Sequence, residues 1–207
     1  MLNLIIDLDN TIYPVKSIGD KLFAPLFNLL ATPKYGLESK TIEKAKEQIM
    51  RIPFQKVSQQ FNFPDELTND ALTLLRDMTY DEPMKYFADY EAIRNLDTKK
   101  FLLTTGFKIL QESKVRSLKI EKDFTEIFVV DPDTSLLTKK DVMIEIMEKY
   151  QLSHAEILVI GDDPDSEIKA AKELEIRSFL LDPENAYPDA LADYRGLRLR
   201  EVLNCID

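Results

Sequence analysis

Two aspartates stand two positions apart after an apolar run near the start of the chain, in the stretch IIDLDNT at residues 5–11. A carboxylate can attack a phosphate ester and form an acyl phosphate, which water then cleaves. Because side chains alternate along a strand, Asp7 and Asp9 can face the same side of a sheet. Asp9 could then protonate the departing alcohol and take a proton from water in the second step. The spacing predicts two acids with divided roles in phosphoryl transfer.

A dianionic phosphate ester repels a carboxylate nucleophile, so such a site also needs positive charge and small hydrogen-bond donors. Mg²⁺ suits oxygen ligands and accepts water and phosphate in its octahedral shell. Asp7 and Asp162 could hold this ion, and Lys139 could neutralise further charge. The hydroxyl of Thr104 and the backbone N–H groups around Thr105 and Gly106 could hold the phosphoryl oxygens.

Short apolar runs predict the strands that would carry these groups, at residues 3–8, 100–105, 126–131, 156–162 and 175–182. Helix-like stretches separate them. In residues 139–150, Val142 and Ile146 lie on one face, and residues 165–176 repeat this period. Strands that alternate with helices predict an α/β fold, with a Rossmann-like, mainly parallel sheet covered by helices on both faces.

The predicted fold brings the chemical groups together, because ligands of an open parallel sheet bind beyond the carboxyl ends of its strands. The groups at such strand ends, or at the start of the helix before the strand at 156–162, are Asp7, Asp9, Thr104, Thr105, Gly106, Lys139, Lys140, Asp162 and Asp163. We therefore expect carboxylates, hydroxyls and a cation at one rim. Asp162 and Asp163 could also cap the helix that follows them.

The interval after the first strand differs in character, because residues 15–85 show amphipathic helical stretches and no convincing strand. Helix starts are predicted near Ser39 and near Asp65 or Thr68. We expect a catalytic core of residues 1–14 and 86–207, with residues 15–85 forming a small all-helical cap. In and near this insert, the aromatics Tyr13 and Phe54 are expected in the core and the cations Arg51 and Lys56 in solvent, with contact to substrate as the alternative.

Composition narrows the classes of function. The 207 residues are 44% hydrophobic and 31% charged, and no stretch approaches the roughly 18 uninterrupted apolar residues of a membrane span. The start of the chain lacks the basic flank of a signal peptide, so a cytoplasmic location is expected. A net charge of −10 argues against binding a nucleic-acid polymer but allows a small phosphorylated ligand. Cys205 has no partner, and the single histidine, His154, is expected at the surface.

Four motifs in order resemble those of the haloacid dehalogenase superfamily of phosphohydrolases: DLDNT at 7–11, LLTTG at 102–106, a lysine in TKKD at 138–141, and VIGDDPDSEI at 159–168. The resemblance covers the expected core and leaves the insert matched by position and class. It implies that Asp7 is the nucleophile, Asp9 the general acid and base, Thr104 a phosphate contact and Lys139 the charge stabiliser. It also implies that Asp162 and the backbone carbonyl of Asp9 bind Mg²⁺.

The chain departs from the family pattern at several positions. Asn10 stands where Gly is frequent and Thr105 where Asn is frequent, and both are counted with Gly106 as candidate substrate contacts. Glu167 stands where the second downstream acid is commonly Asp, so Asp163 or a water could complete the metal shell instead. Lys140 is a rival to Lys139, which fits the family frame better.

These residues predict a Mg²⁺-dependent phosphomonoester hydrolase acting on a small phosphorylated metabolite. The opening DLDNTIYP resembles the pyrimidine 5′-nucleotidase branch, which makes a nucleoside monophosphate one candidate substrate. Alternatives are a phosphomutase and a haloacid dehalogenase, the latter disfavoured by Asp9 because displacement of halide delivers no proton to an alkoxide. A further alternative is a catalytically reduced binding or regulatory protein of the same fold.

Overall fold

The computed structural model describes residues 2–206, and a six-stranded parallel sheet forms its centre. The strand order is β3-β2-β1-β4-β5-β6. The strands are β1 (Asn3–Ile6), β2 (Lys100–Thr105), β3 (Glu126–Val130), β4 (Ile157–Gly161), β5 (Arg177–Leu181) and β6 (Tyr194–Gly196). The predicted α/β fold with a parallel sheet is confirmed. Met1 and Asp207, the outer limits of the expected core, lie outside the described residues.

Central position explains the composition of β1, which pairs with β2 on one side and with β4 on the other. Leu4, Ile5 and Ile6 are almost completely buried, as expected for a strand covered on both faces. The strand ends at Ile6, two residues before the expected limit of 3–8, and the backbone N–H of Asp7 makes one further hydrogen bond to β4. The short edge strand β6 was not predicted.

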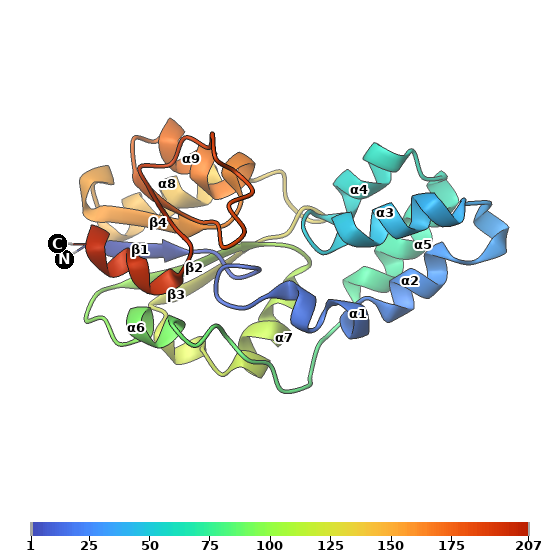
Figure 1. Cartoon of the computed structure of the whole chain (residues 1–207), viewed down its shortest axis with the longest axis horizontal. Helices are drawn as coiled ribbons and strands as arrows, with labels where there is room; N and C mark the ends of the chain where they lie inside the picture. Colours follow the sequence, from blue (N-terminus) through green and yellow to red (C-terminus); the bar gives the residue numbers. More distant parts are fainter. Residues whose placement is uncertain (1, 207) are drawn as a thin grey trace.

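Helices cover both faces of the sheet (Figure 1). One face carries α8 (Lys139–Tyr150) and α9 (Lys169–Glu173), which pack on residues such as Ile5 and Val159. The other face carries α6 (Tyr90–Arg94), α7 (Lys108–Leu118) and the 3-10 helix Leu199–Cys205. Short 3-10 turns lie at Val15–Ser17, Pro33–Tyr35, Glu121–Asp123 and His154–Glu156, and a π-helical turn at Pro164–Ile168.

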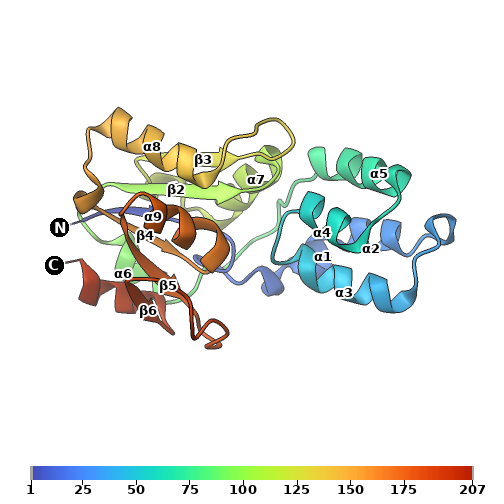
Figure 2. The same cartoon turned by 90° about the horizontal axis from the view of Figure 1, so that it is seen from above.

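A helical cap lies between β1 and β2 in the sequence, as predicted. Its helices are α1 (Gly19–Leu22), α2 (Ala24–Leu30), α3 (Ser39–Ile49), α4 (Phe54–Phe61) and α5 (Asp65–Arg76). Figures 1 and 2 show this group to one side of the sheet, beyond its carboxyl edge. The predicted helix start at Ser39 is confirmed, and of the alternatives Asp65 and Thr68 the next predicted helix begins at Asp65. Helix α4 begins at Phe54, directly after Pro53.

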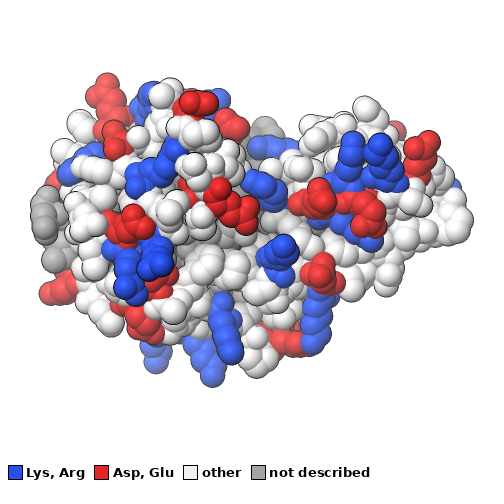
Figure 3. Space-filling model, in the orientation of Figure 1, with Lys and Arg blue, Asp and Glu red and all other residues white. Residues whose placement is uncertain are grey.

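One apolar cluster extends from the α7 face of the sheet into the cap without interruption. It includes Ile6 and Leu102 in the sheet, Ile12 in the connection, and Leu26 and Leu67 in the cap. Figure 3 shows that the charged side chains on the visible face are of both signs and interspersed. In the described part of the chain, every helix falls short of the length and apolar character needed to cross a bilayer.

Candidate active site

Sheet topology brings the predicted strand ends together. Because β1 lies between β2 and β4, Asp7 at the end of β1 has Thr104 on one side and Asp162 on the other. The backbone N–H of Asp7 donates to the carbonyl oxygen of Ile160 at 2.9 Å, which extends the pairing with β4 by one residue. All three side chains line one cavity.

Lys139 is the first residue of α8, and its ammonium group lies between two carboxylates. Its Nζ is 2.6 Å from Asp7 Oδ1 and 2.6 Å from Glu167 Oε2, and all three residues are buried. The neighbouring Lys140 forms an exposed pair with Glu173, with 2.9 Å between Nζ and Oε2. Of the two rival lysines, Lys139 therefore contacts the expected nucleophile.

Asp7, Asp162 and Glu167 form a three-carboxylate cluster, in which one oxygen of each lies within 4.8 Å of the others. Oxygen donors of this kind fit a hard divalent cation such as Mg²⁺. The side chain of Asp163 is used differently, because its Oδ1 accepts a hydrogen bond of 2.9 Å from the N–H of Asp165 at the start of the π-helical turn. Its own N–H donates to Glu167 Oε1 at 3.0 Å, which helps to hold Glu167 toward the cluster.

The crowding of these acids changes their pKa values. Burial raises the pKa of Asp7 to about 7, against the opposing effect of Lys139, and the charge of Glu167 adds to the rise. Burial and the charges of Glu167 and Asp7 likewise raise the pKa of Asp162. Burial also acts against ionised Glu167, but Lys139 outweighs it and lowers the pKa of that carboxyl. If all three carboxylates were ionised, the cluster would have more negative charge than Lys139 alone can balance.

Asp9 lies in a separate set of contacts formed by hydrogen-bond donors. Lys114 Nζ is 2.9 and 3.0 Å from its two carboxylate oxygens, Gln111 Nε2 donates at 2.9 Å, and the hydroxyl of Tyr13 also donates. Burial opposes ionisation of Asp9, but these donors, led by Lys114, hold its pKa below the usual range. Tyr13 is fully buried, in agreement with the expectation that it belongs to the core.

Sequence reasoning missed Gln111 and Lys114, both on α7. Their spacing shows that they share a helix face that follows closely on the LLTTG strand end, but it does not show that this face turns toward Asp9. The amide of Gln111 reaches three oxygens: Asp9 Oδ2 at 2.9 Å, Thr104 Oγ1 at 2.7 Å and the Thr105 carbonyl at 3.1 Å. Gln111 thus joins the loop after β1 to the end of β2.

The other predicted substrate contacts are Asn10, Thr105 and Gly106. Asn10 has a left-handed φ of 59°, and its Oδ1 accepts a hydrogen bond of 3.1 Å from the N–H of Val15. A short polar side chain that bonds locally tolerates this conformation, which explains Asn where the family often has Gly. The N–H of Gly106 donates to the carbonyl of Val130 at 3.0 Å, whereas the side chain of Thr105 is partly exposed.

A cavity of about 610 Å³ contains these groups and is lined on its far side by the cap. Cap residues that line it are mostly apolar, among them Phe23, Leu26, Met50 and Phe54. Gln55 also lines it, and both atoms of its amide are buried without a hydrogen-bond partner among the described residues. The cavity is therefore polar at the sheet and largely apolar at the cap.

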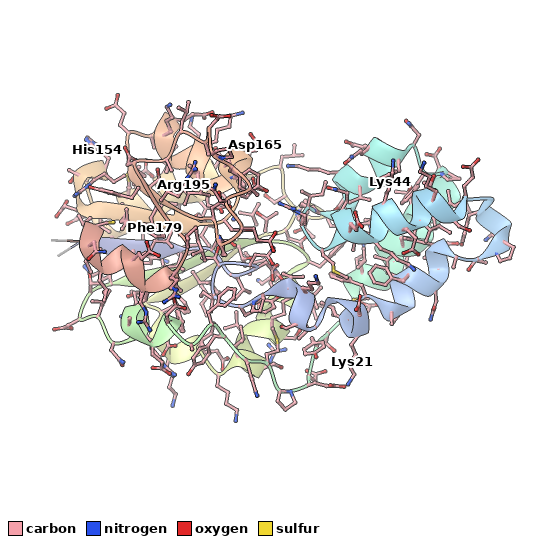
Figure 4. All side chains as sticks on the ribbon, in the orientation of Figure 1. Lys21, Lys44, His154, Asp165, Phe179 and Arg195 are labelled. Carbon is pink, nitrogen blue, oxygen red and sulfur yellow. The ribbon has the colours of Figure 1, made fainter. Side chains whose placement is uncertain are left out.

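Two contacts connect the cap to the core near this cavity. Arg76 of α5 forms a bidentate pair with Asp133, with distances of 2.6 and 2.9 Å, and the guanidinium group of Arg51 donates to the hydroxyl of Tyr187. His154 is exposed, as expected, and Figure 4 places it at the end of the core remote from the cap. Histidine therefore has no place in this site.

Comparison with known proteins supports the family expectation. A family model described as haloacid dehalogenase-like hydrolase matches residues 4–181. A search of curated proteins found no match. Among solved structures, a haloacid dehalogenase-like hydrolase of Streptococcus pneumoniae is 18% identical with a TM-score of 0.73, covering 100% of this chain and 99% of that one.

Two further solved structures are similar over their whole length. A HAD hydrolase of Bacillus subtilis, solved with bound magnesium, has 18% identity and a TM-score of 0.69, covering 100% of this chain and 98% of that chain. A HAD phosphatase of Thermococcus onnurineus has 18% identity and a TM-score of 0.68 with the same coverage. At this identity these likenesses establish the fold.

Proposed function

The chain belongs to the haloacid dehalogenase-like hydrolases, and from this membership we propose that it is a Mg²⁺-dependent phosphomonoester hydrolase that works through an aspartyl-phosphate on Asp7. The observation that carries the proposal is the position of Lys139, whose ammonium group is buried between Asp7 and Glu167 at the base of the cavity. A lysine at the positive end of a helix is electrostatically unfavourable by itself, so its buried carboxylate partners provide the reason for its position.

In the first half-reaction, a carboxylate oxygen of Asp7 attacks the phosphorus atom and the bond from phosphorus to the ester oxygen breaks. Asp9 is ionised in the free protein, so it takes up a proton from solvent when the dianionic ester binds beside it, and it then gives this proton to the departing oxygen, which leaves as an alcohol. The hydroxyl of Thr104 lies on the β2 side of Asp7 and is a donor for one phosphoryl oxygen. Lys139 offsets the charge that gathers around Asp7.

In the second half-reaction, water attacks the phosphorus of the aspartyl-phosphate and loses a proton to Asp9. The bond between phosphorus and Asp7 breaks, so inorganic phosphate leaves and both carboxyl groups return to their starting states. The apolar cap wall of the cavity limits access of bulk water during these steps.

A divalent cation would be held by Asp7, Asp162 and Glu167, and it would supply positive charge against the dianionic ester. Burial and the neighbouring carboxylates raise the pKa values of Asp7 and Asp162, and a divalent cation would favour the ionised form of both. Asp163 is assigned to capping the π-helical turn, and Lys140 to the surface pair with Glu173.

For the substrate we propose a small phosphorylated metabolite whose leaving group contacts the largely apolar cap wall. A nucleoside monophosphate is a candidate within this class, supported by the resemblance of DLDNTIYP to the pyrimidine 5′-nucleotidase branch. The proposed domain limits remain residues 1–14 and 86–207 for the core and 15–85 for the cap.

Turnover of 4-nitrophenyl phosphate with Mg²⁺, followed by a panel of nucleotides and sugar phosphates, tests the proposal. We expect hydrolysis that EDTA abolishes, and a loss of at least about a thousandfold in kcat for Asp7→Asn, whose side chain keeps its shape but is a poor nucleophile. Full activity of Asp7→Asn would contradict the proposed nucleophile. No turnover across the panel would favour a binding protein, and chloride release from a haloacid would favour a dehalogenase.

A further inference from the structure

Gln111 is a buried polar residue whose role the proposed reaction leaves open. It lies in the first turn of α7, where its backbone N–H donates to the carbonyl of Phe107 at 3.0 Å. The residue is 1% exposed. It lines the cavity together with Asp9 and Thr104. A buried amide is costly unless its hydrogen bonds are made, so its partners indicate why it is present.

The orientation of the Gln111 amide is determined by its neighbours. Its Nε2 faces Thr104 Oγ1 at 2.7 Å, Asp9 Oδ2 at 2.9 Å and the Thr105 carbonyl at 3.1 Å. An ionised carboxylate and a carbonyl can only accept hydrogen bonds, so the NH₂ group and not the amide oxygen must face them. The opposite orientation would place Oε1 against acceptor oxygens.

This orientation has a consequence for the Thr104 hydroxyl. A hydroxyl oxygen that accepts from Gln111 has its one proton free to donate elsewhere. The hydroxyl lies at the wall of the cavity, on the side where a phosphoryl oxygen would stand beside Asp7. Gln111 therefore favours the arrangement in which Thr104 acts as a donor. The second N–H of the same amide holds the carboxylate of Asp9.

The surrounding chain leaves just enough room for this amide. Gly106 follows β2 with a φ of +154°, and a Cβ built there would lie 3.1 to 3.2 Å from the Gln111 side chain. Gln111 Oε1 is buried and has no hydrogen-bond partner among the described residues, so the amide gives up one hydrogen bond to make the others. This cost is understandable if the contacts of Nε2 serve the reaction.

We propose that Gln111 is a positioning residue that sets the Thr104 hydroxyl as a phosphate donor and fixes the Asp9 carboxylate for proton transfer. The inference rests on the proposed function, because it concerns the same two steps. The amide of Gln111 thereby links Thr104, which would bind phosphate, to Asp9, which would protonate the leaving group. These two residues follow different strands, β2 and β1.

Gln111→Met tests the proposal, because methionine keeps the approximate volume and removes both N–H donors. Two substrates separate its effects: phenyl phosphate, whose leaving oxygen needs a proton, and 4-nitrophenyl phosphate, whose leaving group departs readily without one. We expect kcat on phenyl phosphate to fall about ten- to hundredfold and kcat on 4-nitrophenyl phosphate to fall less. KM should rise for both substrates, because Thr104 is no longer directed toward the phosphate.

Thr104→Val supplies the second arm of the experiment. If Gln111 acts on phosphate through Thr104, the double variant should raise KM no more than the more severe single variant, because both remove the same hydrogen bond. Glu112→Gln, on the more exposed side of α7, is the matched control and should keep the wild-type constants. Thermal unfolding of each variant checks that it is folded.

Wild-type constants for Gln111→Met on both substrates would overturn the inference and leave the proposed function intact. Equal losses of kcat on both substrates with unchanged KM would also overturn it, because they indicate a general structural effect. If Gln111→Met does not fold, Gln111→Asn keeps an amide that is one methylene too short to reach both partners, and the same pattern is expected. Absence of turnover by the wild-type enzyme would instead reject the proposed function itself.

Discussion

Lys139 offsets part of the negative charge of this site. It is buried at the start of α8, where the helix dipole disfavours a cation, and it contacts two carboxylates at 2.6 Å each. The ion pairs with Asp7 and Glu167 raise the pKa of the lysine even though burial acts in the opposite direction. The raised pKa keeps Lys139 charged at neutral pH.

Replacing Lys139 by Met should cost both stability and activity. Removal of one partner from a buried ion pair costs about 3–5 kcal/mol, because the remaining charges are left uncompensated. Lys140→Met is the matched control: it breaks an exposed pair, so a change of about 0–1 kcal/mol and unchanged turnover are expected. Urea unfolding without Mg²⁺ and turnover of 4-nitrophenyl phosphate measure the two effects. Equal behaviour of the two variants would contradict the role assigned to Lys139.

Residues such as Asp7, Lys139 and Asp162 could be predicted from the sequence because each stands at the end of a strand or at the start of a helix. Such positions are set by chain order once the parallel sheet is inferred. Gln111 and Lys114 could not be assigned in this way. Their contacts with Asp9 depend on how α7 is rotated against the sheet, and its apolar pattern leaves that rotation open.

At the scale of elements, the junction of β4 with the π-helical turn determines where Glu167 lies. The turn covers Pro164–Ile168 and brings Glu167 back against the end of the strand. A Cβ built on Gly161 would lie 2.0 Å from Glu167 Oε1 and 2.3 Å from its Cγ, distances that folded proteins do not tolerate. Glycine at the end of β4 is thus a condition for the three-carboxylate cluster.

Gly161→Ala should displace Glu167 and weaken Mg²⁺ binding by about ten- to a hundredfold, as losses of supporting contacts in metal sites commonly do. Titration calorimetry with MgCl₂ measures the affinity. Because both changes act through the same carboxylate, adding Gly161→Ala to Glu167→Gln should weaken binding little further. Wild-type affinity in Gly161→Ala would show that Glu167 is unnecessary for the metal.

Other elements show where sequence patterns were sufficient and where they were not. The helices from Ser39 and from Asp65 have clear amphipathic periods, and both start as predicted. Helix α4 follows Pro53 and is eight residues long, so its period is too brief to distinguish it from a loop. Strand β6 has three residues, and only its pairing with β5 reveals it.

At the scale of the whole molecule, Mg²⁺ should act as a stabilising ligand. The three-carboxylate cluster belongs to the folded state, and a ligand that binds only this state stabilises it by about 2.7 kcal/mol at a hundred times its Kd. We therefore expect Tm to rise with MgCl₂ and to fall back on addition of EDTA. Asp162→Asn should abolish this dependence, whereas an unchanged Mg²⁺-induced shift in that variant would contradict the assigned ligands.

The apolar cluster that runs from the sheet through Ile12 into the cap has a consequence for cooperativity. Since the buried side chains of both parts form one body, neither part can lose its packing without exposing the other. We expect a single calorimetric transition, with the measured enthalpy equal to the van't Hoff value. Leu67→Ala, deep in the cap, should lower that one transition, by about 2–5 kcal/mol in unfolding free energy, and should not create a separate peak. The cap and the core would then unfold together, so a destabilising substitution in either part lowers the folded fraction of the whole chain.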